Sequence, residues 1–196
     1  PIVSYEDFEP FIEKARQGNP DVFWPGKIKH FAKSSGTTNA KSKFIPISDE
    51  SLQNCHYKAG KDLLAIYINN HKDSNLFKFK NLRLGGSAEL YESFGTKFGD
   101  LSAILIENLP FWVERTTTPS REVSLMSEWE TKLKAIVSEV KNKDVGSLTG
   151  VPSWMMVLLQ RVLKDTGKKS ISEVWPNLEV FFHGGISFVP YREQYK

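Results

Sequence analysis

Residues 33–46, KSSGTTNAKSKFIP, hold the side chains of this sequence that are best suited to bind phosphate. Four hydroxyls surround one glycine in SSGTT, residues 34–38, which is called the SSGTT segment below. Closely spaced hydroxyl and backbone N–H donors match the several anionic oxygens of a phosphate chain. Gly36 lacks a Cβ and can take the positive φ that turns successive N–H groups inward. Lys33, Lys41 and Lys43 would supply compensating charge.

Composition alone leaves another interpretation open, a polar Ser/Thr turn between two strands. The sequence does not contain the nucleoside-triphosphate loop with its second glycine followed by Lys and Ser/Thr, nor the esterase motif G-x-S-x-G. Its four histidines, at positions 30, 56, 71 and 183, include no pair four residues apart. A histidine-built metal site is therefore not expected.

Five ordered stretches together resemble one enzyme family. They are FAKSSGTTNAKSKFIP, LRLGGS, FGDLSAILIENLP, TGVPSWM and FFHGGISFVPYREQY, and they cover most of the chain from Phe31 to Lys196. The sequence is similar to the bacterial relatives of the plant auxin-responsive acyl-acid amido synthetases, which are adenylate-forming enzymes. SSGTT alone is modest evidence, whereas five matches in the same order are specific.

The resemblance implies an ATP-dependent ligase that works in two half-reactions. A carboxylic acid attacks the α-phosphate of ATP and gives an acyl-adenylate and pyrophosphate. The amine of an amino acid then displaces AMP and forms an amide. ATP and Mg²⁺ are the implied cofactors, and a small carboxylic acid and an amino acid are the implied partners.

The resemblance also implies the roles of individual residues. The phosphate cradle would be Ser34, Ser35, Gly36, Thr37 and Thr38, with Lys43 as its cationic neighbour. His183, Gly184 and Gly185 match a position that contacts the nucleotide and the acyl group, although a lone histidine at a strand end is also a common structural residue. Trp154 and Met155 would line the acyl pocket or, alternatively, pack in the core.

The resemblance places residues 1–196 in the N-terminal part of the large adenylating domain. The adenine-binding and ribose-binding residues and the C-terminal lid would lie beyond Lys196, so this chain alone is expected to be inactive. Two alternatives stay open. One is a non-catalytic nucleotide-binding or scaffolding module, and the other is an adenylating ligase with a thiol acceptor such as coenzyme A. The sequence does not identify the acid or the oligomeric state.

Composition indicates a globular protein. The chain has 196 residues, 40% of them hydrophobic, and a net charge of +3 without a basic block, so neither nucleic acid nor a membrane is an expected partner. No apolar run approaches the roughly 20 residues that span a bilayer. The single cysteine excludes an internal disulfide, and with an acidic N-terminus it favours a cytoplasmic location.

Helical and strand patterns alternate along the chain, which predicts a layered α/β domain. Helical spacing predicts helices from Tyr5 to about Ala15, from Asp49 to about Asn69, and over 102–112 with an interruption at Pro110. Two more are predicted, one that begins near Ser127, which with Glu130 forms a capping-box pair, and one that runs from Pro152 to Gly167. Strands are expected over 43–47 at a sheet edge, over 77–84 and over 178–185, and 116–122 is expected to be a loop.

Overall fold

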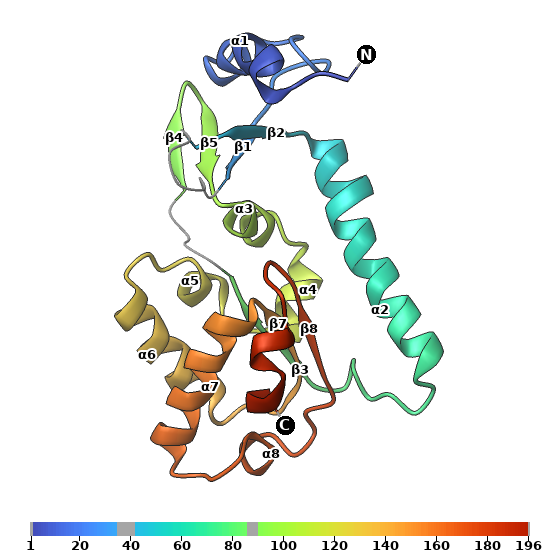
Figure 1. Cartoon of the computed structure of the whole chain (residues 1–196), viewed down its shortest axis with the longest axis vertical. Coiled ribbons are helices and arrows are strands. Elements are labelled where there is room, and N and C mark those ends of the chain that lie inside the picture. The colour runs from blue at the N-terminus through green and yellow to red at the C-terminus, as the bar shows by residue number, and fades with distance from the viewer. Residues whose placement is uncertain (1, 35–41, 86–89, 196) are drawn as a thin grey trace. The chain divides into compact units, whose positions relative to one another are not determined.

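The structure is a computed structural model, and it describes residues 2–34, 42–85 and 90–195. It divides into two compact units, which are described separately (Figure 1). The first unit contains Pro1–Ile66 and Ala88–Asn108, and the second contains Tyr67–Ser87 and Leu109–Lys196. Each unit holds one four-stranded sheet with helices, so the α/β class predicted from the sequence is confirmed.

The sheet of the first unit has the strand order β2-β1-β5-β4. Its strands are β1 (His30–Lys33), β2 (Phe44–Ile47), β4 (Tyr91–Ser93) and β5 (Thr96–Gly99). β1 pairs with β2 antiparallel and with β5 parallel. β2 is thus the edge strand that Pro46 predicts, because proline cannot donate a ladder hydrogen bond.

Apolar residues cover both faces of this sheet. On one face, Ile12 and Ala15 of α1 (Tyr5–Arg16) pack with Phe31 and Phe98. Ala32, the next residue of β1, belongs to a separate cluster on the opposite face, because successive side chains of a strand point to opposite sides. That cluster also contains residues of β2, of the π-helix Ser51–Tyr57 and of α3 (Leu101–Glu107), namely Ile47, Leu52 and Ile104.

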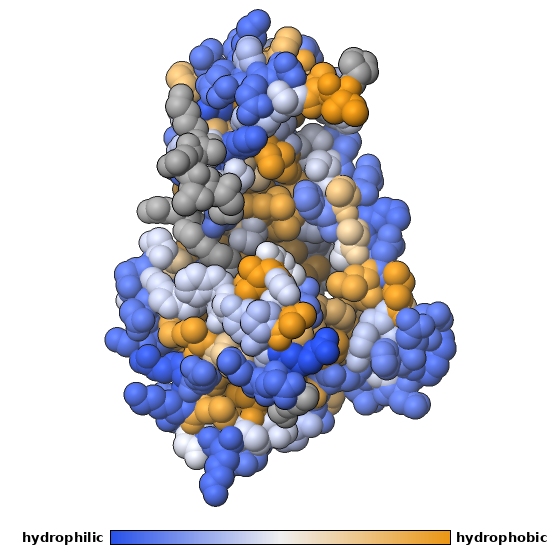
Figure 2. All heavy atoms as spheres, in the orientation of Figure 1, coloured by the Kyte–Doolittle hydropathy of each residue, from blue (hydrophilic) through white to orange (hydrophobic). Residues whose placement is uncertain are grey.

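The helix predicted from Asp49 to Asn69 has two parts. Its first part is the π-helix Ser51–Tyr57, in which Leu52 is buried, and it continues as α2 (Lys58–Asn70). No residue of α2 is buried. Apolar surface lies along this helix in Figure 2, and Leu63 and Ile66 are exposed. The apolar spacing therefore predicted the helix correctly, but not its burial.

The sheet of the second unit is entirely parallel, in the order β6-β3-β7-β8. Its strands are β3 (Lys80–Leu84), β6 (Thr117–Thr118), β7 (Val145–Gly150) and β8 (Val180–His183). Leu82, Leu84 and Leu148 pack in one core with residues of α6 (Trp129–Val140) and α7 (Pro152–Thr166). The fully buried indole of Trp175 closes this core, and its Nε1 donates to the carbonyl of Val140 at 3.3 Å.

Several sequence expectations for the second unit need correction. The segment 116–122 is not only loop, since it contains the last residue of α4 (Phe111–Thr116), all of β6 and the start of α5 (Arg121–Ser124). The N-cap of α6 is Glu128 and not Ser127, because the Glu128 carboxylate accepts hydrogen bonds from the N–H groups of Glu130 and Thr131. β7 and the short helix α8 (Ile171–Val174) were not predicted.

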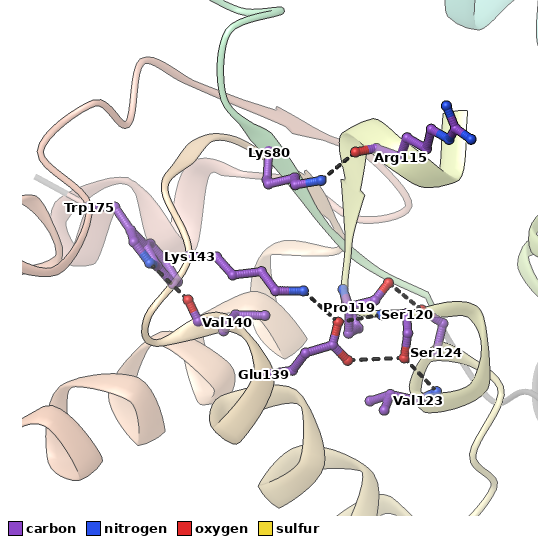
Figure 3. Close-up of polar contacts among 10 residues, drawn as sticks. All are labelled: Lys80, Arg115, Pro119, Ser120, Val123, Ser124, Glu139, Val140, Lys143 and Trp175. Carbon is purple, nitrogen blue, oxygen red and sulfur yellow. Dashed lines mark hydrogen bonds and ion pairs between the residues drawn. The ribbon is translucent and has the colours of Figure 1, made fainter. Parts of the chain in front are cut away.

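A carboxylate attaches the start of α5 to α6. Glu139 Oε1 accepts the backbone N–H of Ser120 at 2.8 Å, and Glu139 Oε2 accepts the Ser120 hydroxyl at 3.0 Å (Figure 3). The ammonium of Lys143 donates to Oε1 at 2.8 Å. Burial would raise the pKa of Glu139, but the hydrogen bonds from Lys143 and Ser120 outweigh it and the net shift is downward. The folded state therefore favours the ionised carboxylate.

Candidate functional site

The SSGTT segment begins at the carboxyl end of β1. Ser34 follows the last residue of that strand, and the chain enters β2 directly after Lys43. Two hydrogen bonds join these positions: the Ser34 N–H donates to the Lys43 carbonyl at 2.9 Å, and the Lys43 N–H donates to Ser34 Oγ at 3.1 Å. Ser34 and Lys43 thus form a closed neck, called the hairpin neck below. The predicted residues Ser35, Gly36, Thr37 and Thr38 lie outside the described residues.

Lys43 contacts the first turn of α1. Its ammonium lies 3.7 Å from Glu6 Oε1 and 4.7 Å from the centre of the Tyr5 ring. The pKa of Glu6 is lowered by its own backbone N–H, then by the Ser4 hydroxyl and by the charge of Lys43. Both side chains of the ion pair are largely exposed, at 44% and 69%, so the pair is weak and Lys43 can turn toward an anion at little cost.

Beside the hairpin neck is an open hollow of about 360 Å³. Lys33 and Ser42, which flank the SSGTT segment in sequence, contribute to its wall, as does Arg16 of α1. The Arg16 guanidinium lies 3.7 Å from the centre of the Phe44 ring. The remaining lining residues are Tyr5, Glu9, Glu13 and Phe44. The hollow therefore combines two cations with two carboxylates, and sequence analysis identified neither Arg16 nor Tyr5 as part of this region.

In the second unit, His183 ends β8 at the carboxyl edge of the parallel sheet. Ligands of open α/β sheets bind at this edge. The exposed imidazole of His183 stacks on Phe188 at a centroid distance of 4.3 Å. Gly185 has φ +84°, and a Cβ there would lie 3.2 Å from Val151 Cγ2, so the turn after β8 favours glycine. Gly185 and Val151, the residue before α7, thus lie close together, and they belong to the motifs FFHGGISFVPYREQY and TGVPSWM of the sequence analysis.

Trp154 and Met155 have different environments. Met155 is fully buried in the core of the second unit, which is the packing role given as the alternative above. Trp154 is 49% exposed, and its ring meets the ring of Trp129 edge-on at 4.8 Å. Trp154 is therefore the one of the two with surface available to a ligand.

His30, at the start of β1, is buried, and its Nδ1 has no hydrogen-bond partner among the described residues. Its Nε2 lies 3.4 Å from Asn108 Nδ2. Burial lowers the pKa of His30, against the opposing charges of Glu107 and Asp49. Among residues 2–34, 42–85 and 90–195, no three His, Cys, Asp or Glu side chains are grouped in a way that could hold a metal ion. In the same ranges no helix is long and apolar enough to cross a membrane.

Known proteins share both sequence and fold with this chain. Jasmonoyl-L-amino acid synthetase JAR6 of Nicotiana attenuata is 41% identical over 54 residues, which are 27% of this chain and 9% of that protein. Jasmonoyl-L-amino acid synthetase GH3.5 of Oryza sativa subsp. japonica is 31% identical over 98 residues, which are 50% of this chain and 15% of that protein. These matches span only a small part of the relatives' length.

A solved structure, the GH3.15 acyl acid amido synthetase, superposes on the whole chain with a TM-score of 0.73 at 14% sequence identity. The superposition covers 44% of that protein, so this chain spans less than half of it. At this identity the likeness concerns the fold. The model of the GH3 family N-terminal domain matches residues 1–196. Because that match covers the full sequence, the chain belongs to the GH3 family.

Proposed function

We propose that this chain is the N-terminal part of the adenylating domain of an acyl acid amido synthetase, and that it comes from the bacterial branch of the family. The complete enzyme would activate a carboxylic acid with ATP, release pyrophosphate, and transfer the acyl group from AMP to the amine of an amino acid. The C-terminal lid and the adenine and ribose contacts would lie outside residues 1–196. The single cysteine supports a cytoplasmic location.

The observation that carries this proposal is the hairpin neck. The reciprocal bonds between Ser34 and Lys43, at 2.9 and 3.1 Å, hold on one sheet the two residues between which the rest of the SSGTT segment lies in the sequence. In the proposed mechanism the donors of Ser34, Ser35, Gly36, Thr37 and Thr38 bind the phosphate chain and stabilise the charge that develops on the departing pyrophosphate. Preorganised donors are effective because they need no rearrangement during the reaction.

Lys43 would act as a mobile cation in this mechanism. Its exposed pair with Glu6 is weak, so an incoming phosphate can replace the carboxylate as its partner. Mg²⁺ would neutralise further charge on the triphosphate, bound mainly by phosphate oxygens and water. The donor set fits such an arrangement, since Arg16, Lys33 and the Ser42 hydroxyl line the hollow beside the hairpin neck and can pair with phosphate oxygens, while a metal ion would offset the carboxylates of Glu9 and Glu13.

We assign the turn after β8 to the nucleotide and the acyl group. His183 is exposed at the carboxyl edge of the sheet, and no atom of the described residues lies within 4 Å of the position that a Cβ of Gly184 would take. Bare backbone of this kind can lie against a planar ligand. Trp154 would contribute an apolar surface to the acyl pocket, whereas Met155 supports it from the core.

The proposal is tested by exchange of labelled pyrophosphate into ATP, with the full-length protein and a panel of aromatic and aliphatic carboxylic acids. We expect exchange that depends on one class of acid. The variant Thr37→Val with Thr38→Val should abolish that exchange and leave the fold intact, since it removes two donors at nearly constant volume. Wild-type exchange in the double variant would remove the SSGTT segment from the mechanism. ATP binding without exchange for any acid would favour the non-catalytic module.

A further inference from the structure

One hydroxyl of α1 satisfies two backbone groups of β2. Tyr5 Oη accepts the N–H of Phe44 at 2.9 Å and donates to the carbonyl of Phe44 at 3.3 Å. The two residues are 39 positions apart in the sequence. Phe44 directly follows Lys43, which closes the hairpin neck with Ser34. The Tyr5 hydroxyl thus binds the residue that directly follows the hairpin neck.

The geometry of the antiparallel pair explains why Phe44 needs such a partner. Backbone groups of successive residues in a strand point to opposite edges, and the groups of Lys43 face Ser34. The N–H and carbonyl of Phe44 therefore face away from β1. β2 is the edge strand of its sheet, so no further strand among the described residues of the first unit pairs with them. The Tyr5 hydroxyl takes the place of a neighbouring strand at this single residue.

Tyr5 is held in this position by the rest of α1. Ile12 and Ala15 anchor the helix in the core, and Arg16 at its end lies 3.7 Å over the Phe44 ring. The two ends of α1 therefore both hold Phe44: Tyr5 at the start of the helix binds its backbone, and Arg16 at the end contacts its ring. The ammonium of Lys43 also lies over the Tyr5 ring, 4.7 Å from its centre. A shift of Tyr5 would move both the neck backbone and the lysine side chain.

We propose that Tyr5 is a positioning residue for ATP binding: through Phe44 it sets the geometry of the hairpin neck and of Lys43. This inference rests on the proposed function, in which Ser34 and Lys43 contact the phosphate chain. Tyr5 itself touches no substrate in this scheme. The Tyr5 hydroxyl stabilises the arrangement of Ser34 and Lys43 before ATP arrives, which lowers the free energy needed to order these two residues on binding.

The test compares Tyr5→Phe with wild type in acid-dependent pyrophosphate exchange by the full-length protein. This change removes the hydroxyl but keeps the ring under Lys43. Tyr57→Phe is the matched control, because the Tyr57 hydroxyl also donates to a backbone carbonyl in the first unit, that of Leu105 at 3.0 Å. Tyr57 packs against the cluster that contains Ala32 and Ile47, on the opposite face of the sheet from Tyr5, so its variant measures the effect of losing such a hydroxyl elsewhere in the unit.

For Tyr5→Phe we expect the KM for ATP to rise about tenfold, while kcat and the KM for the carboxylic acid stay within about twofold of wild type. Tyr57→Phe should leave all three parameters within about twofold. Direct calorimetric titration with ATP should show the same roughly tenfold weakening of the Kd for Tyr5→Phe only. An unchanged KM and Kd for ATP, or equal changes in both variants, would overturn the positioning role.

The outcomes separate this inference from the proposed function. Wild-type exchange together with an unaffected Tyr5→Phe variant would refute the inference and leave the ligase intact. Wild-type protein that binds ATP but exchanges no pyrophosphate would refute the ligase, and the Kd comparison would then still decide the role of Tyr5. Wild-type protein that binds no ATP would refute both.

Discussion

Replacement of Glu139 by alanine tests the packing of α5 on α6 in the second unit. The change removes the acceptor of three hydrogen bonds, two from Ser120 at 2.8 and 3.0 Å and one from Lys143 at 2.8 Å. Hydrogen bonds to a charged group contribute about 1.5–3 kcal/mol each when they are well protected from water. Because the side chain of Glu139 is 23% exposed, water replaces part of what is lost. We therefore expect a loss of about 2 kcal/mol in the free energy of unfolding at pH 7.

The effect should depend on pH in a definite direction. The folded-state pKa of Glu139 lies below its ordinary value of 4.5, so its contribution to stability is fully present above about pH 4.5. It is lost as the pH falls through the folded pKa, because the protonated carboxyl no longer favours the folded state. The stability difference between wild type and Glu139→Ala should accordingly shrink on acidification.

The assay is thermal unfolding followed by tryptophan fluorescence. Four of the five tryptophans belong to the second unit, and one of them, Trp175, is fully buried next to the end of α6, so the emission reports mainly on this unit. A loss of about 2 kcal/mol corresponds to a decrease of roughly 4–8 °C in Tm for a protein of this size. Ser138→Ala, an exposed change on the same helix, is the control and should shift Tm by less than about 2 °C. A Tm for Glu139→Ala that equals the control, or a difference that does not change with pH, would refute the reasoning.

Further predictions concern two glycines and one histidine. Gly146→Ala should destabilise the protein by about 1–3 kcal/mol, because the new Cβ would lie 2.7 Å from Phe79 Cβ. Gly60→Ala on α2 should stabilise it by about 0.5–1 kcal/mol, since alanine favours a helix and no other atom of the described residues lies within 4 Å of the new Cβ. Urea unfolding measures both, and equal effects of the two changes would contradict the packing. The His30 imidazole should titrate below pH 6.5 by NMR, since burial lowers its pKa. Its contribution to stability is then present above pH 6.5 and is lost as the pH falls through the folded-state pKa. A titration of His30 at or above pH 6.5 would contradict its burial.

Local sequence signals predicted some elements well. Pro152 begins α7, and Gly167 ends it with φ +68°, because these two residue types fit those positions whatever surrounds them. Pro46 correctly placed β2 at an edge. β7 was missed because its sequence, VGSLTG, lacks an apolar alternation. Its burial depends on long-range packing, in which Gly146 accommodates Phe79.

The candidate site shows the same division. The SSGTT segment could be proposed from the sequence as a phosphate-binding site, since hydroxyls around a glycine are a local property. Tyr5 and Arg16 could not be identified in this way, because they meet Phe44 only after α1 packs on the sheet. Trp154 and Met155 are neighbours in the sequence, yet one is 49% exposed and the other is fully buried. Only the orientation of α7 in the core distinguishes them.

The central claim is that this chain belongs to a ligase that joins a carboxylic acid to an amine through an adenylate. The most direct measurement is mass spectrometry of the products that the full-length protein forms from ATP, a carboxylic acid panel, the twenty amino acids and coenzyme A. We predict AMP and an N-acyl amino acid in equal amounts. Formation of an acyl thioester would contradict the amine acceptor, and formation of ADP and phosphate without AMP would contradict adenylation.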